Sequence, residues 1–497
     1  MPTTPLRLSA QAAHDELAAK LAALPAELEL TREFPPEVLA EADAAVADRP
    51  LPDPDRTDLE FVTMDPPGAT DLDQAFFIER DGGGWRVFYA IADLPAFVAP
   101  GGAIDAEAHR RGQTVYAPDG RIPLHPTVIS EGAASLLSSQ LRGAFVWEHA
   151  LDASGNVTST TVGRARIRSR RQLDYATSQA DLEGDRGRDA ALLGMLRDVG
   201  ETRVALEAER GGASLSTPEI LVSLTDGRTA PSRTAPPRYM LERRALLPVE
   251  AWNAQLSLMT GMAAASMMLD GGVGILRTMP PAQPDAIDRL RRQARALGTP
   301  WPAGQPYGDY LRMLDGTNPK HLAILHAAAS LFRGAGYTPF DGAAPVETMQ
   351  SAVGAPYAHV TAPLRRLVDR FGLVICEALS AGAAVPEWAR AALPELPKQM
   401  ARSSNLAGRL DRMTLDAVEA ALLAPRIGEE FAAVVLSAGG MSGSAAEDGK
   451  RRDGGTVQLV DPAVEALCDG HLEPGTDVRV RLVEADVATA TVRFTLA

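Results

Sequence analysis

A short loop crowded with carboxylates constrains this chain more than any other feature. The apolar run from Leu59 to Val62 leads into Asp65, Asp71 and Asp73, and two prolines and a glycine stand between the first two of these. Clustered negative charges repel one another unless cations neutralise them. Hard oxygen ligands at close spacing are what Mg²⁺ and Mn²⁺ select. The pattern therefore predicts a divalent-metal site suited to phosphate chemistry.

An ordinary turn is the alternative interpretation of the same residues. Asp, Pro, Gly and Thr together favour solvated loops, and an acidic chain with a formal net charge of -15 contains acidic loops that have no function. The spacing of the carboxylates does not decide between the two interpretations. The sequence on either side of the loop favours the metal site.

Five further segments accompany the carboxylate loop in a fixed order. They are Trp85 to Asp93, Gly101 to Asp105, Thr114 to Pro118, Ile122 to Pro126 and, far downstream, Tyr357 to Asp369. Together they resemble the ribonuclease II family, the RNB-domain 3′-to-5′ exoribonucleases. The last segment resembles the family's Thr-Ser-Pro-Ile-Arg block, with Ala362 where serine is usual. Two such blocks at opposite ends of a long segment make the resemblance specific.

The resemblance implies an α+β protein. We expect an RNB catalytic domain, a mixed sheet packed with helices, over residues 59–425, and a small C-terminal S1-like OB β-barrel over residues 426–497. Residues 1–58 are expected to form a short helical segment, with a helix-turn-helix-like arrangement as one option. This segment is too short for the two cold-shock barrels of longer members, which is typical of a short bacterial form.

Local patterns agree with this division. Helical apolar spacing predicts helices over residues 9–30, 35–46, 249–269, 284–297, 319–332, 363–379 and 403–423. Short β-branched runs predict barrel strands over residues 431–436, 456–460, 477–482 and 490–496. The barrel has only Phe431 and Phe494 as aromatic residues, so its capacity to stack bases is predicted to be weak.

Composition limits the class of protein further. No charged-then-apolar leader is present at the start, and no apolar run approaches the ~20 residues of a membrane span. We therefore expect a cytoplasmic protein without a membrane partner. Cys376 and Cys468 lie far apart inside apolar segments, which predicts buried thiols rather than a disulfide.

The net charge of -15 argues against a nucleic-acid partner. A basic cluster from Arg164 to Arg171 is the counter-argument, because it is expected to line a local channel. Nearly all positive charge is arginine, which binds phosphate in a fork and stacks on bases. Coding bias explains the same preference equally well.

The resemblance assigns metal ligands. It implies that Asp65, Asp71 and Asp73 hold Mg²⁺, with Mn²⁺ as a second option, and that Asp73 is indispensable for catalysis. The family's fourth position, usually Asp, is Gln74 here. An amide oxygen ligates a metal without supplying charge, so one ion is expected to bind more weakly.

The resemblance also assigns contacts to RNA. Arg365 is expected to approach the scissile phosphate as a catalytic residue, with Arg366 as the poorer candidate. Tyr175 and Glu250 correspond to residues that contact the sugar near the 3′ end, although packing or helix capping explains either residue equally well. Tyr116 matches the outer aromatic clamp, and the inner clamp falls near Leu215.

We therefore expect a metal-dependent, processive 3′-to-5′ exoribonuclease that converts single-stranded RNA to nucleoside 5′-monophosphates. The alternative is a catalytically weakened RNA-binding regulator of RNB fold, which Gln74 and the acidic balance favour. A third class, a phosphohydrolase that uses Asp71 as nucleophile and Asp73 as acid, normally places this pair directly after an apolar strand, and the preceding Gly68 to Thr70 is not one. The sequence does not indicate an oligomeric state.

Overall fold

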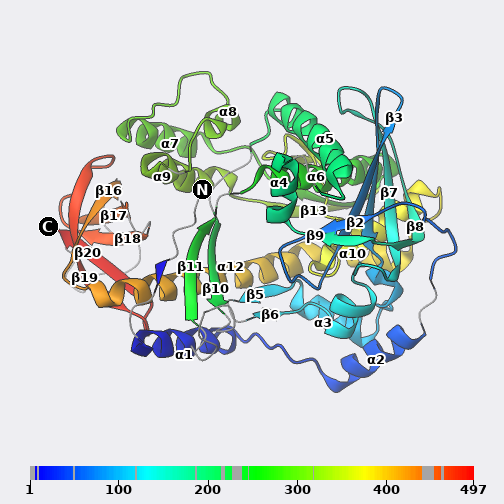
Figure 1. Ribbon diagram of the computed structural model, residues 1–497, viewed down its shortest axis with the longest axis horizontal. Helices are drawn as coiled ribbons and strands as arrows, with labels where there is room; N and C mark the ends of the chain where they lie inside the picture. Colours follow the sequence, from blue (N-terminus) through cyan, green and yellow to red (C-terminus); the bar gives the residue numbers. More distant parts are fainter. Residues whose placement is uncertain are drawn as a thin grey trace.

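A long helix joins a sheet-containing body to a small barrel in the computed structural model (Figure 1). The structure describes residues 6–7, 11–48, 51–117, 120–184, 187–213, 219–225, 238–244, 246–316, 318–438, 453–460 and 464–497. The joining helix is α12 (Leu396–Leu423), which runs from the barrel toward the centre of the molecule.

The body is built on a six-stranded sheet with the order β8-β7-β4-β3-β2-β9. β2 and β9 pair in parallel and the other neighbours are antiparallel, so the sheet is mixed, as predicted. Its strands are β2 (Val62–Met64), β3 (Gln74–Asp81), β4 (Gly84–Ala92), β7 (Leu141–Leu151), β8 (Val157–Arg168) and β9 (Arg171–Leu173).

Both faces of this sheet are buried. On β4, Val87 and Tyr89 face a core shared with α5 (Ala190–Glu209), α6 (Pro248–Gly271) and α10 (Leu367–Ser380). Phe88 and Ala90 face a second core shared with α2 (Pro36–Ala47) and α3 (Ala103–Arg111). This strict alternation is the period of a strand whose two faces are covered by helices.

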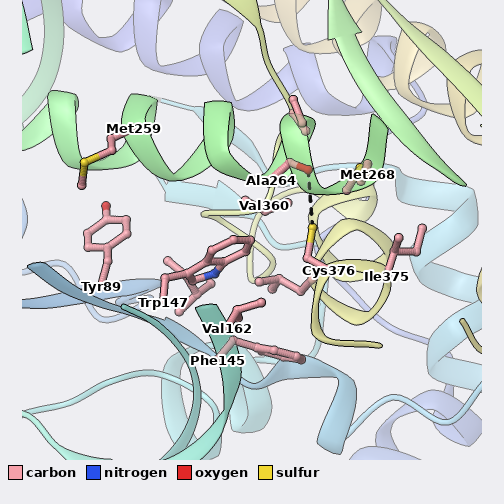
Figure 2. Packing of buried hydrophobic residues seen from close by; sticks show 14 of the residues in the cluster. Tyr89, Phe145, Trp147, Val162, Met259, Ala264, Met268, Val360, Ile375 and Cys376 are labelled. Atoms are coloured by element: carbon pink, nitrogen blue, oxygen red, sulfur yellow. Dashed lines mark hydrogen bonds between the residues drawn. The ribbon is translucent and has the colours of Figure 1, made fainter. Parts of the chain in front are cut away.

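Figure 2 shows the first of these cores, where Trp147 lies between α6 and α10. The thiol of Cys376 on α10 points to the carbonyl oxygen of Ala264 on α6, at 3.8 Å. Cys376 and Cys468 are both free and buried, as the sequence predicted.

The remaining elements surround this framework. The helices are α1 (Gln11–Glu27), α4 (Tyr175–Gly184), α7 (Pro284–Ala296), α8 (Tyr307–Arg312), α9 (Pro319–Ala328) and α11 (Glu387–Ala392). The strands are β1 (Leu6–Arg7), β5 (Val115–Ala117), β6 (Gly120–Ile122), β10 (Glu219–Thr225), β11 (Arg238–Arg244), β12 (Val273–Thr278), β13 (Gly336–Asp341), β14 (Met349–Gln350) and β15 (Ala355–Pro356). None of the described helices is long and apolar enough to cross a membrane.

The C-terminal barrel is closed, with the strand order β16-β17-β18-β20-β19. Its interior contains Phe431 and Phe494, whose rings meet edge to face with centroids 5.6 Å apart. Neither ring is therefore free to stack on a base. The strands are β16 (Glu430–Ala438), β17 (Gly454–Leu459), β18 (Glu465–Asp469), β19 (Asp477–Asp486) and β20 (Thr491–Leu496).

One hydrophobic cluster fixes α1, α12 and the barrel against the body. Leu17 and Leu21 of α1 pack with Leu410 of α12, and with Val487, which follows β19. The cluster also contains Val115 of β5. The position of the barrel is thus set by α12 and α1.

Two sequence predictions need correction in detail, and several elements were missed. The helix expected over 363–379 begins at Leu367, because the Asp369 carboxylate accepts a hydrogen bond from the Ala362 N–H at 2.7 Å and holds the preceding residues in a loop. The helix expected from residue 403 begins at Leu396, with a proline in its first turn. Strand β18 and helix α5 were not predicted.

The basic cluster from Arg164 to Arg171 was expected to line a channel, but most of its charge is taken up by ion pairs. Three of its arginines are ion-paired within the body, so their charge is already neutralised. The partners are Asp93 and Glu377 for Arg164, Asp55 for Arg166, and Asp189 for Arg171.

A buried glutamate on α12 makes stability depend on pH. Glu419 is 9 % exposed, and burial together with Asp416 and Glu465 raises its pKa from the ordinary 4.5 to about 8. The folded protein therefore holds a proton that the unfolded chain releases, and the stability associated with this proton is lost as pH rises from about 4.5 to 8.

We predict that Glu419→Gln stabilises the protein at pH 8.5 and has little effect at pH 4.5. The gain is on the order of a few kcal/mol, because each tenfold change in proton affinity corresponds to about 1.4 kcal/mol. Denaturant unfolding at both pH values measures it. Glu473→Gln, at an exposed position of the barrel region, is the control. An equal effect of Glu419→Gln at both pH values would contradict the prediction.

Candidate active site

The carboxylate loop is fixed at both ends by the sheet. The Asp65 N–H donates to the Leu173 carbonyl of β9 at 3.1 Å, and the Ala92 N–H of β4 donates to the Asp73 carbonyl at 2.9 Å. Between these anchors the chain turns at Gly68, whose φ of +81° is a conformation that glycine adopts without strain. The three carboxylates therefore lie at one end of the sheet.

Asp73 contacts the downstream segment, Tyr357 to Asp369. Its side chain accepts a hydrogen bond at 2.8 Å from the N–H of Leu364, 291 residues away, and lies 3.4 Å from Nε of Arg365. Asp73 is only 4 % exposed. Burial raises its pKa to about 8, against the opposing effect of Arg365. The two distant sequence blocks thus meet at this carboxylate.

Asp65 has a buried carboxylate oxygen without a hydrogen-bond partner. Within the described part of the chain, nothing donates to its Oδ2. Burial raises the pKa of Asp65 to about 6; Arg365 opposes this shift and Asp71 adds to it. A buried anionic oxygen is costly unless it is paired, and a hard cation at this point would satisfy it.

Asp71 is engaged by the β5–β6 hairpin. Its carboxylate forms an ion pair with Arg121 and accepts a hydrogen bond from the Tyr116 hydroxyl at 3.1 Å. Arg121 also pairs with Glu131 at 2.6 Å. Over the described ranges, no three His, Cys, Asp or Glu side chains are grouped as a metal would need. The donors nevertheless fit a divalent ion, because Asp65 has an unpartnered oxygen, Asp73 is a buried carboxylate of the same loop, and Arg365 acts on the pKa of both.

Gln74 is the first residue of β3, and both the nitrogen and the oxygen of its side-chain amide form hydrogen bonds. Its Nε2 donates to the Thr361 carbonyl at 2.6 Å, and its Oε1 accepts from the Tyr89 hydroxyl at 3.0 Å. Tyr89 is also 2.7 Å from Oγ of Ser257. A carbonyl oxygen only accepts hydrogen bonds, which fixes the orientation of the amide. Whether this amide contacts a metal stays a prediction.

The two neighbouring arginines have different surroundings. Arg366 forms a fork on the buried Asp369, with both N–O distances 2.8 Å. Arg365 is 46 % exposed and contacts Asp73. A guanidinium that is exposed and next to the carboxylates is the one suited to a phosphate. The structure therefore favours Arg365 over Arg366 for that role.

Two cavities meet at these arginines, which line both of them. One, of about 320 Å³, is also lined by Gln74, Tyr175 and Glu250. The other, of about 290 Å³, is also lined by Tyr116, Gln113, Thr114, Ala407 and Asp411. The predicted metal loop and the predicted RNA contacts are thus brought to one place.

Tyr175 and Glu250 face the same cavity with different partners. The Tyr175 hydroxyl accepts from Nδ2 of Asn253 at 3.5 Å, and burial raises its pKa to about 12. Glu250 accepts from the Leu247 N–H at 2.9 Å and pairs with Arg244 at 2.5 Å, so it does cap α6. Leu215 lies outside the described residues. The sugar contacts stay predictions.

Sequence reasoning missed several residues of the site. Asn253 and Asp411, which line the cavities, were not singled out. Neither was Arg121, which directly precedes a recognised segment and pairs with Asp71. Thr361 lies in the recognised downstream segment but was assigned no role. Asn253, Asp411 and Arg121 carry no local signal for these positions, because only the fold brings them to the site.

Comparison with known proteins identifies the family. The RNB domain family matches residues 54–377, and the RNase II-type exonuclease C-terminal S1 domain matches residues 429–497. The first match covers more than half of the chain. The chain therefore belongs to the ribonuclease II family of RNB-domain exoribonucleases, as its sequence blocks predicted. The expected domain limits at residues 59 and 426 stay predictions.

Relatives match over part of their length. The probable exosome complex exonuclease RRP44 of Caenorhabditis elegans is 29% identical over 332 residues, which is 64% of this chain and 34% of that protein. Ribonuclease R of Escherichia coli K12 is 36% identical over 172 residues, 33% of this chain and 21% of that protein. The matched segments thus span about a third or less of these relatives.

Solved structures confirm the fold. The apo form of Mycoplasma genitalium RNase R superposes with a TM-score of 0.80 at 18% identity, covering 97% of this chain and 78% of that one. Yeast Ssd1, described as a pseudonuclease, gives a TM-score of 0.68 at 14% identity, covering 93% of this chain and 57% of that one. The α+β body and the five-stranded barrel of S1 type are therefore confirmed.

We predict that Arg365→Lys and Arg366→Lys separate chemistry from stability. Arg366→Lys should destabilise the fold by roughly 2–3 kcal/mol, because it removes one arm of a fork on a buried carboxylate. Arg365→Lys should leave stability unchanged and slow single-turnover RNA cleavage, because lysine keeps the charge and loses the fork. Denaturant unfolding and single-turnover rates measure the two effects. The reverse pattern would show that Arg366 is the phosphate-binding residue.

Proposed function

We propose that this protein is a divalent-metal-dependent exoribonuclease that degrades single-stranded RNA processively from its 3′ end to nucleoside 5′-monophosphates. One observation supports this most strongly. The unpartnered oxygen of Asp65 and the buried carboxylate of Asp73 lie in one short loop, beside the exposed guanidinium of Arg365, where two cavities meet.

Asp65, Asp71 and Asp73 are the residues that would hold Mg²⁺ or Mn²⁺. When bound, such ions supply an activated water and neutralise charge on the attacking and leaving oxygens. Asp71 is free to contribute only when its ion pair with Arg121 opens, and Arg121 keeps Glu131 as a partner in that case. Arg365 binds the scissile phosphate and stabilises the charge that develops on it.

The remaining proposed RNA contacts are distributed between the two cavities at Arg365 and Arg366. Tyr116 is 48 % exposed on the β5–β6 hairpin and offers a ring face to a base in one cavity. Tyr175 and Glu250 line the other cavity, where a phenol and a carboxylate suit the 2′-hydroxyl that distinguishes RNA from DNA. Mycoplasma genitalium RNase R has been solved with ribose-methylated single-stranded RNA and with double-stranded RNA. These complexes support RNA as the partner here.

The barrel is expected to add little to RNA affinity. The arginines on its described strands are paired with carboxylates at the surface, namely Arg479 and Arg481 with Glu430, and Arg493 with Glu484. Exposed pairs of this kind are weak and open readily, so the barrel retains some capacity to contact phosphates. The cavities of the body carry the specific contacts.

The second candidate function is a catalytically weakened RNA-binding regulator. Gln74 replaces the usual carboxylate, and the fold is shared with the pseudonuclease Ssd1 of yeast. The presence of Asp65, Asp71, Asp73 and Arg365 together favours the enzyme. Metal-dependent release of mononucleotides separates the two functions.

We predict a descending ladder on RNA alone. Purified protein is incubated with 5′-labelled single-stranded RNA or with DNA of matching sequence, in Mg²⁺, in Mn²⁺ or in EDTA. RNA should shorten from its 3′ end in either metal, and DNA should not. Asp73→Asn should abolish cleavage while RNA affinity changes only a few fold. Binding contacts are spread over both cavities, whereas metal activation is concentrated in the carboxylate loop. Comparable turnover in Asp73→Asn would exclude the proposed site.

Gln74→Asp should lower the metal concentration needed for half-maximal cleavage. The added charge strengthens cation binding near Asp73, although the hydrogen bond from Nε2 to Thr361 is lost. Titrating Mn²⁺ into wild type and variant during cleavage measures the change, and Gln74→Ala controls for the lost bond. An unchanged midpoint in Gln74→Asp would place residue 74 outside the coordination shell.

A further inference from the structure

A third cavity, larger than the two at the candidate active site, lies away from that site. It has a volume of about 710 Å³ and is walled by the start of β8, the end of α5, the second half of α6 and Leu379 of α10. Helix α6 borders this cavity from Met259 onward and the active-site cavity from Glu250 to Leu258. The two cavities have no lining residue in common.

Two arginines border this cavity with few partners for their positive charge and N–H groups: Arg203 of α5, and Arg210, which directly follows α5. Arg203 is 5 % exposed, and among the described residues its guanidinium donates one hydrogen bond, from Nη1 to the Gly155 carbonyl at 3.1 Å. Its Nε is buried and, within the described ranges, has no acceptor; the same holds for Nε of Arg210. Burial and the charge of Arg210 lower the pKa of Arg203 to about 10.

One carboxylate lies between the two arginines on the helix. Glu207 is buried, does not line the cavity, and accepts a hydrogen bond from Nε2 of Gln255 at 2.7 Å. Its carboxylate therefore offsets part of the positive charge of the two arginines from outside the cavity. A buried guanidinium with unused donors is costly, and an anion in the cavity would satisfy those donors on the side that Glu207 leaves open.

The opposite wall is apolar and adaptable. Met259, Met262 and Met267 of α6 line it together with Leu379. Methionine side chains adapt to flat rings and make favourable sulfur–aromatic contacts. The exposed Asp270 stands at the rim, where its carboxylate is able to accept hydrogen bonds from an amine or hydroxyl group. The volume lies within the range of roughly 300–1,000 Å³ typical of small-molecule sites.

We propose that this cavity binds a nucleoside 5′-monophosphate, with the phosphate between Arg203 and Arg210 and the base against the methionine wall. A phosphate monoester is close to a dianion at neutral pH, and two guanidinium groups match its charge and its oxygens. The flat base accounts for the apolar wall, and the polar rim suits the sugar or an exocyclic amine. The proposal does not rest on the nuclease activity, because it uses no residue of the catalytic loop.

Calorimetry on the full chain in EDTA tests the site, with AMP, inorganic phosphate and adenosine as probes. AMP should bind at least tenfold more tightly than either phosphate or adenosine, because only AMP fills both halves of the cavity. Arg210→Gln, at a half-buried position, should weaken AMP binding at least tenfold. Tyr175→Phe, in the active-site cavity, should leave it unchanged.

A second variant separates binding from folding. Met262→Glu places a carboxylate on the apolar wall at a partly exposed position and should also weaken AMP binding tenfold. Thermal unfolding without ligand verifies that both variants are folded, and AMP should raise the unfolding midpoint of wild type only. Failure of AMP to bind at millimolar concentration would overturn the proposal. Equal binding of phosphate and AMP, or loss of AMP binding in Tyr175→Phe alone, would also overturn it.

Discussion

The contact between Asp73 and the loop that contains Arg365 holds the candidate active site together. The Leu364 N–H and the Arg365 guanidinium both approach this carboxylate, and Asp369 in turn holds the loop through the Ala362 N–H and Arg366. A buried carboxylate is tolerated only with such partners. The catalytic geometry therefore depends on a non-local pairing between the start of β3 and the start of α10.

The hairpin that carries Tyr116 is positioned from the opposite side. Val115 of β5 and Ile122 of β6, which pair with each other, pack in the same cluster as α1 and α12. The proposed RNA contact of Tyr116 thus depends on the N-terminal helix and on the helix that fixes the barrel. A disturbance of α12 would reach Tyr116 and, through its hydroxyl, Asp71. Contacts among the described residues in this way connect the barrel to the carboxylate loop through α12 and the paired strands β5 and β6.

The sequence predicted those features that depend on local spacing. The carboxylate loop, the block around Arg365 and most of the helices follow from motif order and periodicity, and the structure brings the two blocks together. The pairing of Arg121 with Asp71 and the bonds of the Gln74 amide were not predictable, because their partners are distant in the sequence. The cluster from Arg164 to Arg171 was wrongly expected to offer free positive charge for the same reason. Charge density in a sequence does not reveal the carboxylates that the fold places next to the arginines.

Gln74 changes the electrostatics of the site more than its shape. An ionised carboxylate has no hydrogen to donate to the Thr361 carbonyl, so the link that Gln74 makes between β3 and the Arg365 loop depends on the neutral amide. The site thereby gains a hydrogen bond and loses a negative charge. Arg121 and Arg365 already lie against Asp71 and Asp73. If a cation binds here as proposed, it must compete with two guanidinium groups for the carboxylates that remain, and this competition would limit how strongly the cation is held.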